Sequence, residues 1–352
     1  MPAIQSVCSS DPRRVRLAAR SLAVALLGAL ALARGGAAGA AADDPRAAFR
    51  RPSAIPYPAE NADSPARREL GQRLFFEPQL SASGLVACAT CHNPALDWSD
   101  GLPRAVGHEM KVLARRTPSI ANLAYGELLF WDGRAASLEE QALGPITSAA
   151  EMNLSAEQLV ARLNAIPAYK PLFDAAYPGE GISPESIGKA IATFERSVVS
   201  APAAFDRWVD GDERAISKSA KRGFALFTGA AGCASCHSGW RFTDDSFHDI
   251  GSSGEDRGRG KIVEGIPVLE HAFKTPGLRD VARRAPYMHD GSEATLADVI
   301  ELYARGGRVK RPSLSHEIRP LKLAERDRRD LIAFLETLTS RDAPIALARL
   351  PR

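Results

Sequence analysis

Four of the five cysteines form two copies of one short motif. The copies are Cys88, Cys91 and His92, and Cys233, Cys236 and His237, each in the pattern C-x-x-C-H. This spacing is typical of covalent c-type haem attachment, because two thiols one helical turn apart add to the haem vinyl groups and the adjacent histidine ligates the iron. The sequence therefore predicts two covalent haems, with His92 and His237 as iron ligands.

Two other uses of paired cysteines compete with this interpretation. A zinc ribbon usually places its cysteine pairs roughly 15 to 20 residues apart, whereas Cys88 and Cys233 are separated by 145 positions. A thioredoxin-like redox pair belongs to a βαβ unit, which the sequence around these motifs does not predict. Haem attachment is favoured over both alternatives.

Residues 1–42 have the features of a cleavable export signal. Four arginines between positions 13 and 20 precede the apolar run 21–33, and small residues lead to Ala42. This run is too short to span a bilayer as a stable helix, so cleavage is predicted. Because c-type haem is attached outside the cytoplasm, we expect a periplasmic protein without a membrane span. The remaining chain has 40 basic and 41 acidic residues, a balance that excludes nucleic acid as a partner.

An internal repeat relates the two halves of the remaining chain. Three features recur at a constant offset of 158 positions: Thr117-Pro118 at Thr275-Pro276, Asp132-Gly133 at Asp290-Gly291, and Leu138 at Leu296. Helical periodicity is strongest over 67–76, 186–199, 218–227 and 325–338. The sequence thus predicts an all-α protein with two cytochrome c-like haem domains in tandem, over 43–210 and 211–352.

The same offset predicts that the two irons differ in coordination. Leu296, Val299, Ile300 and Tyr303 follow helical spacing, so Tyr303 faces the core at the end of this stripe. Its counterpart in the first half is Pro145, which has no side-chain donor. Tyrosine can ligate haem iron, so we expect a six-coordinate second haem and an open first haem. The other candidate ligands in the second half are His248, His271, Met288, His289 and His316, and Tyr303 also fits a simple core position.

Several longer segments resemble the bacterial di-haem cytochrome c peroxidases. These segments are Phe130-Trp131-Asp132-Gly133-Arg134, the stretch 140–145, the stretch 247–251 and the stretch 285–291. Tyrosine at position 303 resembles the MauG-like branch, which includes methanobactin-associated members, whereas the better-known peroxidases have methionine there. The resemblance covers essentially the whole chain after the export signal.

The resemblance implies roles for further residues. Trp131 is expected between the haems as an electron conduit, and Gln141, Pro145 and Glu151 are expected to line the distal pocket of the first haem. A calcium ion is implied at the Asn122 side chain and the backbone carbonyls of Arg284 and Pro286. His108 corresponds to a histidine that can cap the first haem in the peroxidases, so His108 is a further candidate ligand of the first iron in the resting state.

These residues support one enzymatic function over two alternatives. An open haem beside Glu151 suits peroxide, since a carboxylate can shuttle the proton that O–O cleavage requires, and a Tyr303 phenolate favours high oxidation states, shared as two ferryl-like irons. We therefore expect oxidation of tryptophan side chains on a partner exported protein. The alternatives are a peroxidase fed by a small cytochrome or cupredoxin, and a di-haem electron carrier.

One departure from the MauG pattern concerns the exit of oxidising equivalents. The surface tryptophan of MauG two residues before the second haem's first cysteine is replaced here by Ala231. Trp240, three residues after His237, is the alternative exit, although it also fits packing around the haem. The basic stretch 305–311 receives no assigned role.

Overall fold

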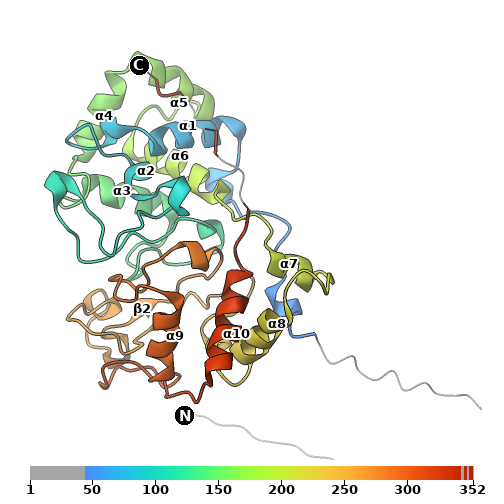
Figure 1. Cartoon of the computed structure of the whole chain (residues 1–352). Coiled ribbons are helices and arrows are strands. Elements are labelled where there is room, and N and C mark those ends of the chain that lie inside the picture. The colour runs from blue at the N-terminus through green and yellow to red at the C-terminus, as the bar shows by residue number, and fades with distance from the viewer. Residues whose placement is uncertain (1–43, 342–344, 347–348, 352) are drawn as a thin grey trace, which may run out of the picture. The chain divides into compact units, whose positions relative to one another are not determined.

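The computed structural model describes residues 44–341, 345–346 and 349–351, so the expected export signal lies outside the described residues. The described chain is helical, with two strands of two residues each (Figure 1). The helices are α1 (Pro65–Phe75), α2 (Cys88–Cys91), α3 (Leu138–Thr147), α4 (Ala156–Asn164), α5 (Lys170–Ala176), α6 (Pro184–Ser197), α7 (Ala204–Val209), α8 (Lys218–Thr228), α9 (Leu296–Ala304) and α10 (Glu325–Glu336). The strands β1 (Phe247–His248) and β2 (Phe273–Lys274) pair in antiparallel fashion.

The four helices predicted from periodicity are confirmed to within two residues, as α1, α6, α8 and α10. Serine side chains cap the start of three of them: Ser64 accepts the backbone N–H of Arg67, Ser183 that of Ser186, and Ser217 that of Ala220. Such caps satisfy amide groups that have no partner inside the helix. Among the described residues, no helix has the length and apolar character needed to cross a membrane.

Each half of the chain is built on a pair of helices that cross at a glycine. A Cβ atom on Gly71 of α1 would lie 1.9 Å from the Ala190 carbonyl oxygen of α6. A Cβ atom on Gly223 of α8 would lie 1.9 Å from the Asp330 carbonyl oxygen of α10. Only glycine permits this approach, so the two halves share one packing solution.

The first core lies among α1, α3, α4, α5 and α6, and its largest fully buried side chains include Phe75, Tyr169, Phe173 and Tyr177. The second core surrounds α8, α9 and α10 and contains tilted and edge-to-face rings of Phe205, Phe224, Phe242 and Phe334. Long connections between the helices remain irregular, as two haem-binding domains require.

Two segments cross over between the cores. Phe49 near the start of the described chain packs in the second core, 4.9 Å from the Phe242 ring, together with Phe205 and Trp208 of α7. Ile345 near the end packs against the first core. Packing therefore differs from the predicted boundaries, which assign residues 43–210 to the first domain and the chain end to the second. The apolar side chains of these segments are buried by the domain that is more distant in sequence.

Candidate active site

One large cavity connects the two C-x-x-C-H motifs. Its volume is about 1240 Å³, and both sets of cysteines and histidines line it. Pockets for drug-sized ligands typically measure about 300 to 1,000 Å³, so this cavity exceeds a single small-molecule site. None of the four described cysteines forms a disulfide. The thiols are thus available for covalent attachment of two haems.

Both motif histidines are oriented by a backbone carbonyl. The Nδ1 atom of His92 lies 3.1 Å from the Trp98 oxygen, and that of His237 lies 2.9 Å from the Phe242 oxygen. Burial lowers the pKa of both imidazoles, which favours the neutral form. With Nδ1–H donating to the carbonyl, the Nε2 lone pair is free for iron, as in other metal-binding histidines.

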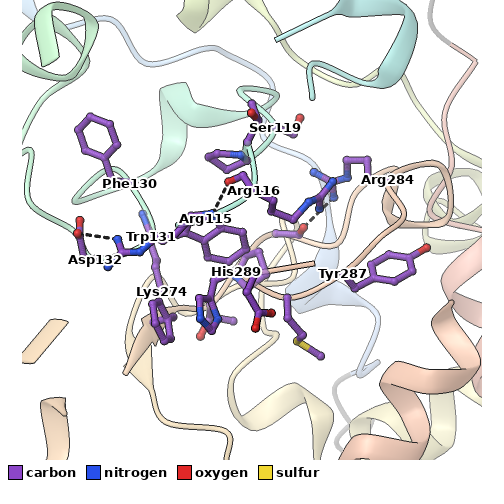
Figure 2. Close-up of a pocket in the computed structure, with 18 of the residues that line it drawn as sticks. Arg115, Arg116, Ser119, Phe130, Trp131, Asp132, Lys274, Arg284, Tyr287 and His289 are labelled. Carbon is purple, nitrogen blue, oxygen red and sulfur yellow. Dashed lines mark hydrogen bonds and ion pairs between the residues drawn. The ribbon is translucent and has the colours of Figure 1, made fainter. Parts of the chain in front are cut away.

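Two arginines on the cavity wall, the buried Arg116 and the half-buried Arg284, provide an independent test of the fit to haem. Arg116 and Arg284 line the cavity (Figure 2), and neither forms an ion pair with a carboxylate in the described part of the chain. Burial and the neighbouring Arg284 lower the pKa of Arg116 to about 10, and its Nε atom is buried without a hydrogen-bond partner. Haem propionates are anions of the kind that such guanidinium groups bind, so the cavity suits haem.

The first haem motif faces a wall made by α3 and the turn that follows it. Gln141 and Pro145 of α3 and Glu151 of the turn all line the cavity, so the structure brings together the three predicted distal residues. The turn is fixed by two hydrogen bonds: Met152 N–H to the Pro145 oxygen (3.1 Å) and Glu151 N–H to the Ser148 oxygen (3.0 Å).

Gly107 allows the neighbouring segment to pack closely against this turn. The His108 N–H donates to the Ala150 oxygen at 3.1 Å, and a Cβ atom on Gly107 would lie 2.0 Å from the same oxygen. A side chain at position 107 would push the turn, and Glu151 with it, out of place. Sequence reasoning missed Gly107 because nothing in the local sequence indicates which segment it approaches.

The second haem motif faces α9. Tyr303 lies in the last turn of this helix and lines the cavity with Leu296, Val299 and Ile300, as the helical stripe predicts. Among the described residues its hydroxyl group has no hydrogen-bond partner, and burial raises the pKa of the phenol. The half-buried Tyr303 side chain lines the cavity, so its oxygen is available as a ligand for the iron of a haem bound there.

Trp131 and His289 form a pair related by the internal repeat. Their rings meet edge to face with centroids 6.5 Å apart, and both side chains line the cavity (Figure 2). The backbone bonds around them are also paired: Arg116 N–H donates to the His289 oxygen (2.8 Å), and Lys274 N–H donates to the Trp131 oxygen (2.9 Å). Arg116 and Lys274 are related by the repeat offset of 158, as are Trp131 and His289. Each half therefore donates a backbone hydrogen bond to the aromatic residue of the other half.

Charged groups reinforce the contact between the two halves. Arg115 donates to Asp132 at 2.7 Å and forms two hydrogen bonds, of 2.7 and 2.9 Å, to Asp256 in the second half (Figure 2 shows Arg115 and Asp132). Although burial opposes ionisation, the bonds from Arg115 lower the pKa of Asp256 to about 2. This network fixes the wall of the cavity beside Trp131.

The other candidate iron ligands are placed less favourably. His108 does not line the cavity, and its Nε2 atom lies 3.8 Å from a carboxylate oxygen of Glu109. His316 is almost fully exposed, and the Nδ1 atom of His271 lies 2.9 Å from the Asp256 carbonyl oxygen. His248 and Met288 line the cavity, but the Nε2 atom of His248 lies 2.8 Å from Asp244.

The proposed calcium residues have structural roles of their own. The Asn122 side chain bonds to Ser200 twice, accepting its N–H at 3.0 Å and donating to its hydroxyl at 2.8 Å. Its repeat counterpart, Asp280, accepts the N–H and hydroxyl of Ser340 at 2.7 Å. Asn122 and Arg284 line the cavity and Pro286 does not. Asn122 therefore fixes the segment after α6 by hydrogen bonds to Ser200, as Asp280 fixes the segment after α10 by hydrogen bonds to Ser340.

A buried carboxyl group near the first motif was missed by sequence reasoning. Glu195 of α6 is 4% exposed and lines the cavity, and its Oε2 atom has no hydrogen-bond partner. Burial raises its pKa to about 8. Its position within a strongly amphipathic helix gives no sign that it faces a cavity rather than solvent.

Comparison with known proteins supplies the family. A di-haem cytochrome c peroxidase family model matches residues 65–214, and a cytochrome c family model matches residues 220–339. The methylamine utilization protein MauG of Methylorubrum extorquens is 56% identical over 309 residues, covering 87% of each chain. The cytochrome c551 peroxidase of Nitrosomonas europaea is 33% identical, covering 83% of this chain and 84% of the relative.

A solved structure supports the same assignment. The crystal structure of a MauG-like protein associated with microbial copper homeostasis superimposes with a TM-score of 0.75 and 32% identity, covering 82% of this chain and 95% of that one. The predicted pair of tandem cytochrome c-type domains is confirmed, as are two c-type haems and a di-haem peroxidase type of oxidoreductase.

Proposed function

This chain belongs to the di-haem cytochrome c peroxidase family, in its MauG branch, and from this premise we propose that it uses hydrogen peroxide to oxidise tryptophan side chains of an exported partner protein. The observation that carries the proposal is the asymmetry within one cavity: Pro145 faces the first motif where Tyr303 faces the second. Identity of 56% to a MauG, against 33% to a cytochrome c551 peroxidase, favours the same branch.

Glu151 performs the proton transfer on the first side. When bound, the haems supply iron that takes up two oxidising equivalents from each peroxide. The Glu151 carboxylate removes the proton from the oxygen that remains and delivers it to the oxygen that leaves as water. Gln141 orients the peroxide by hydrogen bonding, and Pro145 keeps the distal face free of a competing ligand. Positioned groups of this kind contribute roughly 10² to 10⁴ in rate.

Tyr303 and Trp131 serve to store oxidising equivalents. Tyr303 would ligate the iron of the second haem when that haem is bound, and the negative charge of its phenolate would stabilise a high oxidation state. Trp131 lies on the cavity wall next to His289 and connects the halves, because its indole N–H donates to the Arg116 oxygen at 3.0 Å while its own carbonyl binds Lys274. We assign it as the conduit between the haems.

The partner is a separate exported protein, and the enzyme works in the periplasm. Covalent haem attachment takes place outside the cytoplasm, and residues 1–42 have the composition of an export signal. The name of the Methylorubrum relative connects that protein with methylamine utilization, and the solved MauG-like structure is connected with copper homeostasis. These two associations define the first partners to examine.

The test compares two electron sources for the same holoenzyme. Peroxide is added to the di-haem protein together either with a tryptophan-containing protein encoded beside its gene or with a reduced small c-type cytochrome. A mass increase on tryptophan peptides of the neighbouring protein is expected, with slow oxidation of the cytochrome. Rapid cytochrome oxidation without any partner modification would establish the peroxidase instead, and no reaction with peroxide would leave an electron carrier.

A calcium ion bound by the Asn122 side chain and the carbonyls of Arg284 and Pro286 forms part of the proposal. The Asn122 oxygen retains a second lone pair for a cation, and calcium prefers oxygen ligands. Metal analysis of the purified holoenzyme is expected to give one calcium per chain, and chelation should alter the haem spectra. A calcium content of zero with unaltered spectra would remove the ion from the proposal.

A further inference from the structure

An aromatic pair extends from the second haem motif away from the cavity. Trp240 lies three residues after His237, and its ring meets that of Tyr125 edge to face with centroids 4.8 Å apart. Both side chains are half-buried, and the Tyr125 hydroxyl donates to the carbonyl of the exposed residue Ala54 at 3.2 Å. The pair therefore connects the second motif with the exposed residue Ala54.

This pair stands where another exit is missing. Ala231 is buried beside the second motif and has no aromatic ring. Trp240 is connected to the haem environment on two sides: through the backbone to His237, and through Arg279, which lines the cavity and donates to the Trp240 carbonyl at 2.6 Å. Electrons leaving a partner protein can thus reach the second motif without entering the cavity.

The charges around Trp240 determine where an oxidising equivalent rests. The guanidinium groups of Arg51 and Arg279 lie 5.1 and 5.6 Å from the Trp240 ring. Asp206 forms ion pairs with both, at 2.7 Å to Arg279 and 3.9 Å to Arg51, so its single negative charge offsets only one of the two positive charges. A positive neighbour destabilises a tryptophan cation radical, so Trp240 passes the equivalent on. Tyr125 avoids this repulsion, because its phenol loses a proton on oxidation and becomes a neutral radical.

We infer that Trp240 and Tyr125 form the exit through which the enzyme oxidises its protein partner; this rests on the proposed function. In each transfer Trp240 gives one electron to the haem side, and Tyr125 gives one electron to Trp240 and its phenol proton to water. The partner's tryptophan then reduces the Tyr125 radical, which regains a proton. Two such transfers supply the two electrons that one hydrogen peroxide molecule accepts. With two protons, the peroxide is thereby reduced to two water molecules.

The test maps where oxidising equivalents end when no partner is present. The di-haem protein is treated with one equivalent of hydrogen peroxide and the spin trap DMPO, without any reductant, and peptides are analysed by mass spectrometry. Trapped adducts or added oxygen are expected on Tyr125 and Trp240. Tyr125→Phe should leave the mark on Trp240 alone, and Trp240→Phe should remove it from Tyr125.

Two substitutions serve as matched controls. Trp208 lies in the same domain with Arg46 above its ring at 4.9 Å, and Tyr57 is another half-buried tyrosine. Trp208→Phe and Tyr57→Phe should leave the marks on Tyr125 and Trp240 unchanged. Absorption spectra of both haems show whether each variant is folded and loaded.

The outcomes separate this inference from the proposed function. Marks on other residues of the wild-type chain, or a Tyr125 mark that persists in Trp240→Phe, would overturn the exit while the peroxide chemistry stands. If peroxide leaves the haem spectra and all peptides unchanged, the proposed function fails first, and the exit fails with it.

Discussion

The two halves of the molecule share a backbone and differ in their chemistry. Both use a glycine at the helix crossing, a backbone carbonyl on the motif histidine, and a left-handed residue before the shared aromatic position, with φ of 70° at Phe130 and at Met288. They differ at single positions of the repeat, above all at Pro145 and Tyr303. A duplicated scaffold thus gains two functions through a few substitutions around one cavity.

The largest effect is expected at Glu151, because only the first half contains the proton-transfer group. Glu151→Gln keeps the size of the side chain but cannot accept a proton, so the rate constant for the reaction with peroxide should fall roughly 10² to 10⁴-fold. Stopped-flow absorption of the haems measures this rate. The exposed Glu140→Gln on α3 is the control; an equal rate in Glu151→Gln would mean that another group moves the proton.

The second effect concerns Tyr303 and should be confined to the other half. Tyr303→Phe removes the only described hydroxyl at the end of the α9 stripe, so the low-spin signal of one haem should disappear while the other haem is unchanged. Electron paramagnetic resonance of the ferric protein measures both. Tyr287→Phe is the matched control, since Tyr287 lines the same cavity but donates its hydroxyl to the Val281 oxygen at 3.1 Å. Two unaltered signals in Tyr303→Phe would make Tyr303 a core residue.

The comparison of the halves also separates the features that can be predicted from the sequence from those that cannot. The haem motifs and the Tyr303 stripe follow from short-range spacing, and the repeat offset pairs Pro145 with Tyr303, both of which line the cavity. Glu195, Arg116 and Gly107 could not be found in this way, because their roles depend on which distant segment approaches them. Phe49 was likewise unpredictable, since nothing local indicates that it packs in the second core. Spacing predicts local chemistry, whereas contacts between the halves require the structure.

The third effect tests whether the halves depend on their ionic contact. Asp256→Asn removes the carboxylate that Arg115 holds, and the pKa of Asp256 lies near 2, below its ordinary value of 3.8. A depressed pKa stabilises the folded state above about pH 4, and this contribution is lost as the pH falls through 2. We expect the free energy of unfolding to drop by about 2 kcal/mol at pH 7.

Thermal unfolding of the holoenzyme between pH 7 and pH 2.5 measures this difference. The difference in the free energy of unfolding between wild type and Asp256→Asn should become smaller as the pH falls. Asp174→Asn is the control. The Asp174 carboxylate pairs with the exposed Lys170, so its removal should change the free energy of unfolding little. A constant gap at every pH would show that Asp256 acts through packing alone.

The smallest effect is the difference between the stability lost on substituting Asn122 and that lost on substituting its repeat counterpart Asp280. Both tie the end of the last helix of their half to a serine, but Asp280 accepts two hydrogen bonds at 2.7 Å as a charged group, whereas Asn122 is neutral. Hydrogen bonds to charged groups contribute roughly 1.5 to 3 kcal/mol and neutral ones about 1 kcal/mol. Asp280→Ala should therefore lower the free energy of unfolding more than Asn122→Ala.

Chemical denaturation of both variants, with and without chelator, measures the two losses. If Asn122 also binds calcium, the chelator destabilises the wild type and Asp280→Ala but not Asn122→Ala; equal sensitivity in all three would restrict Asn122 to the structural role that the repeat assigns to it.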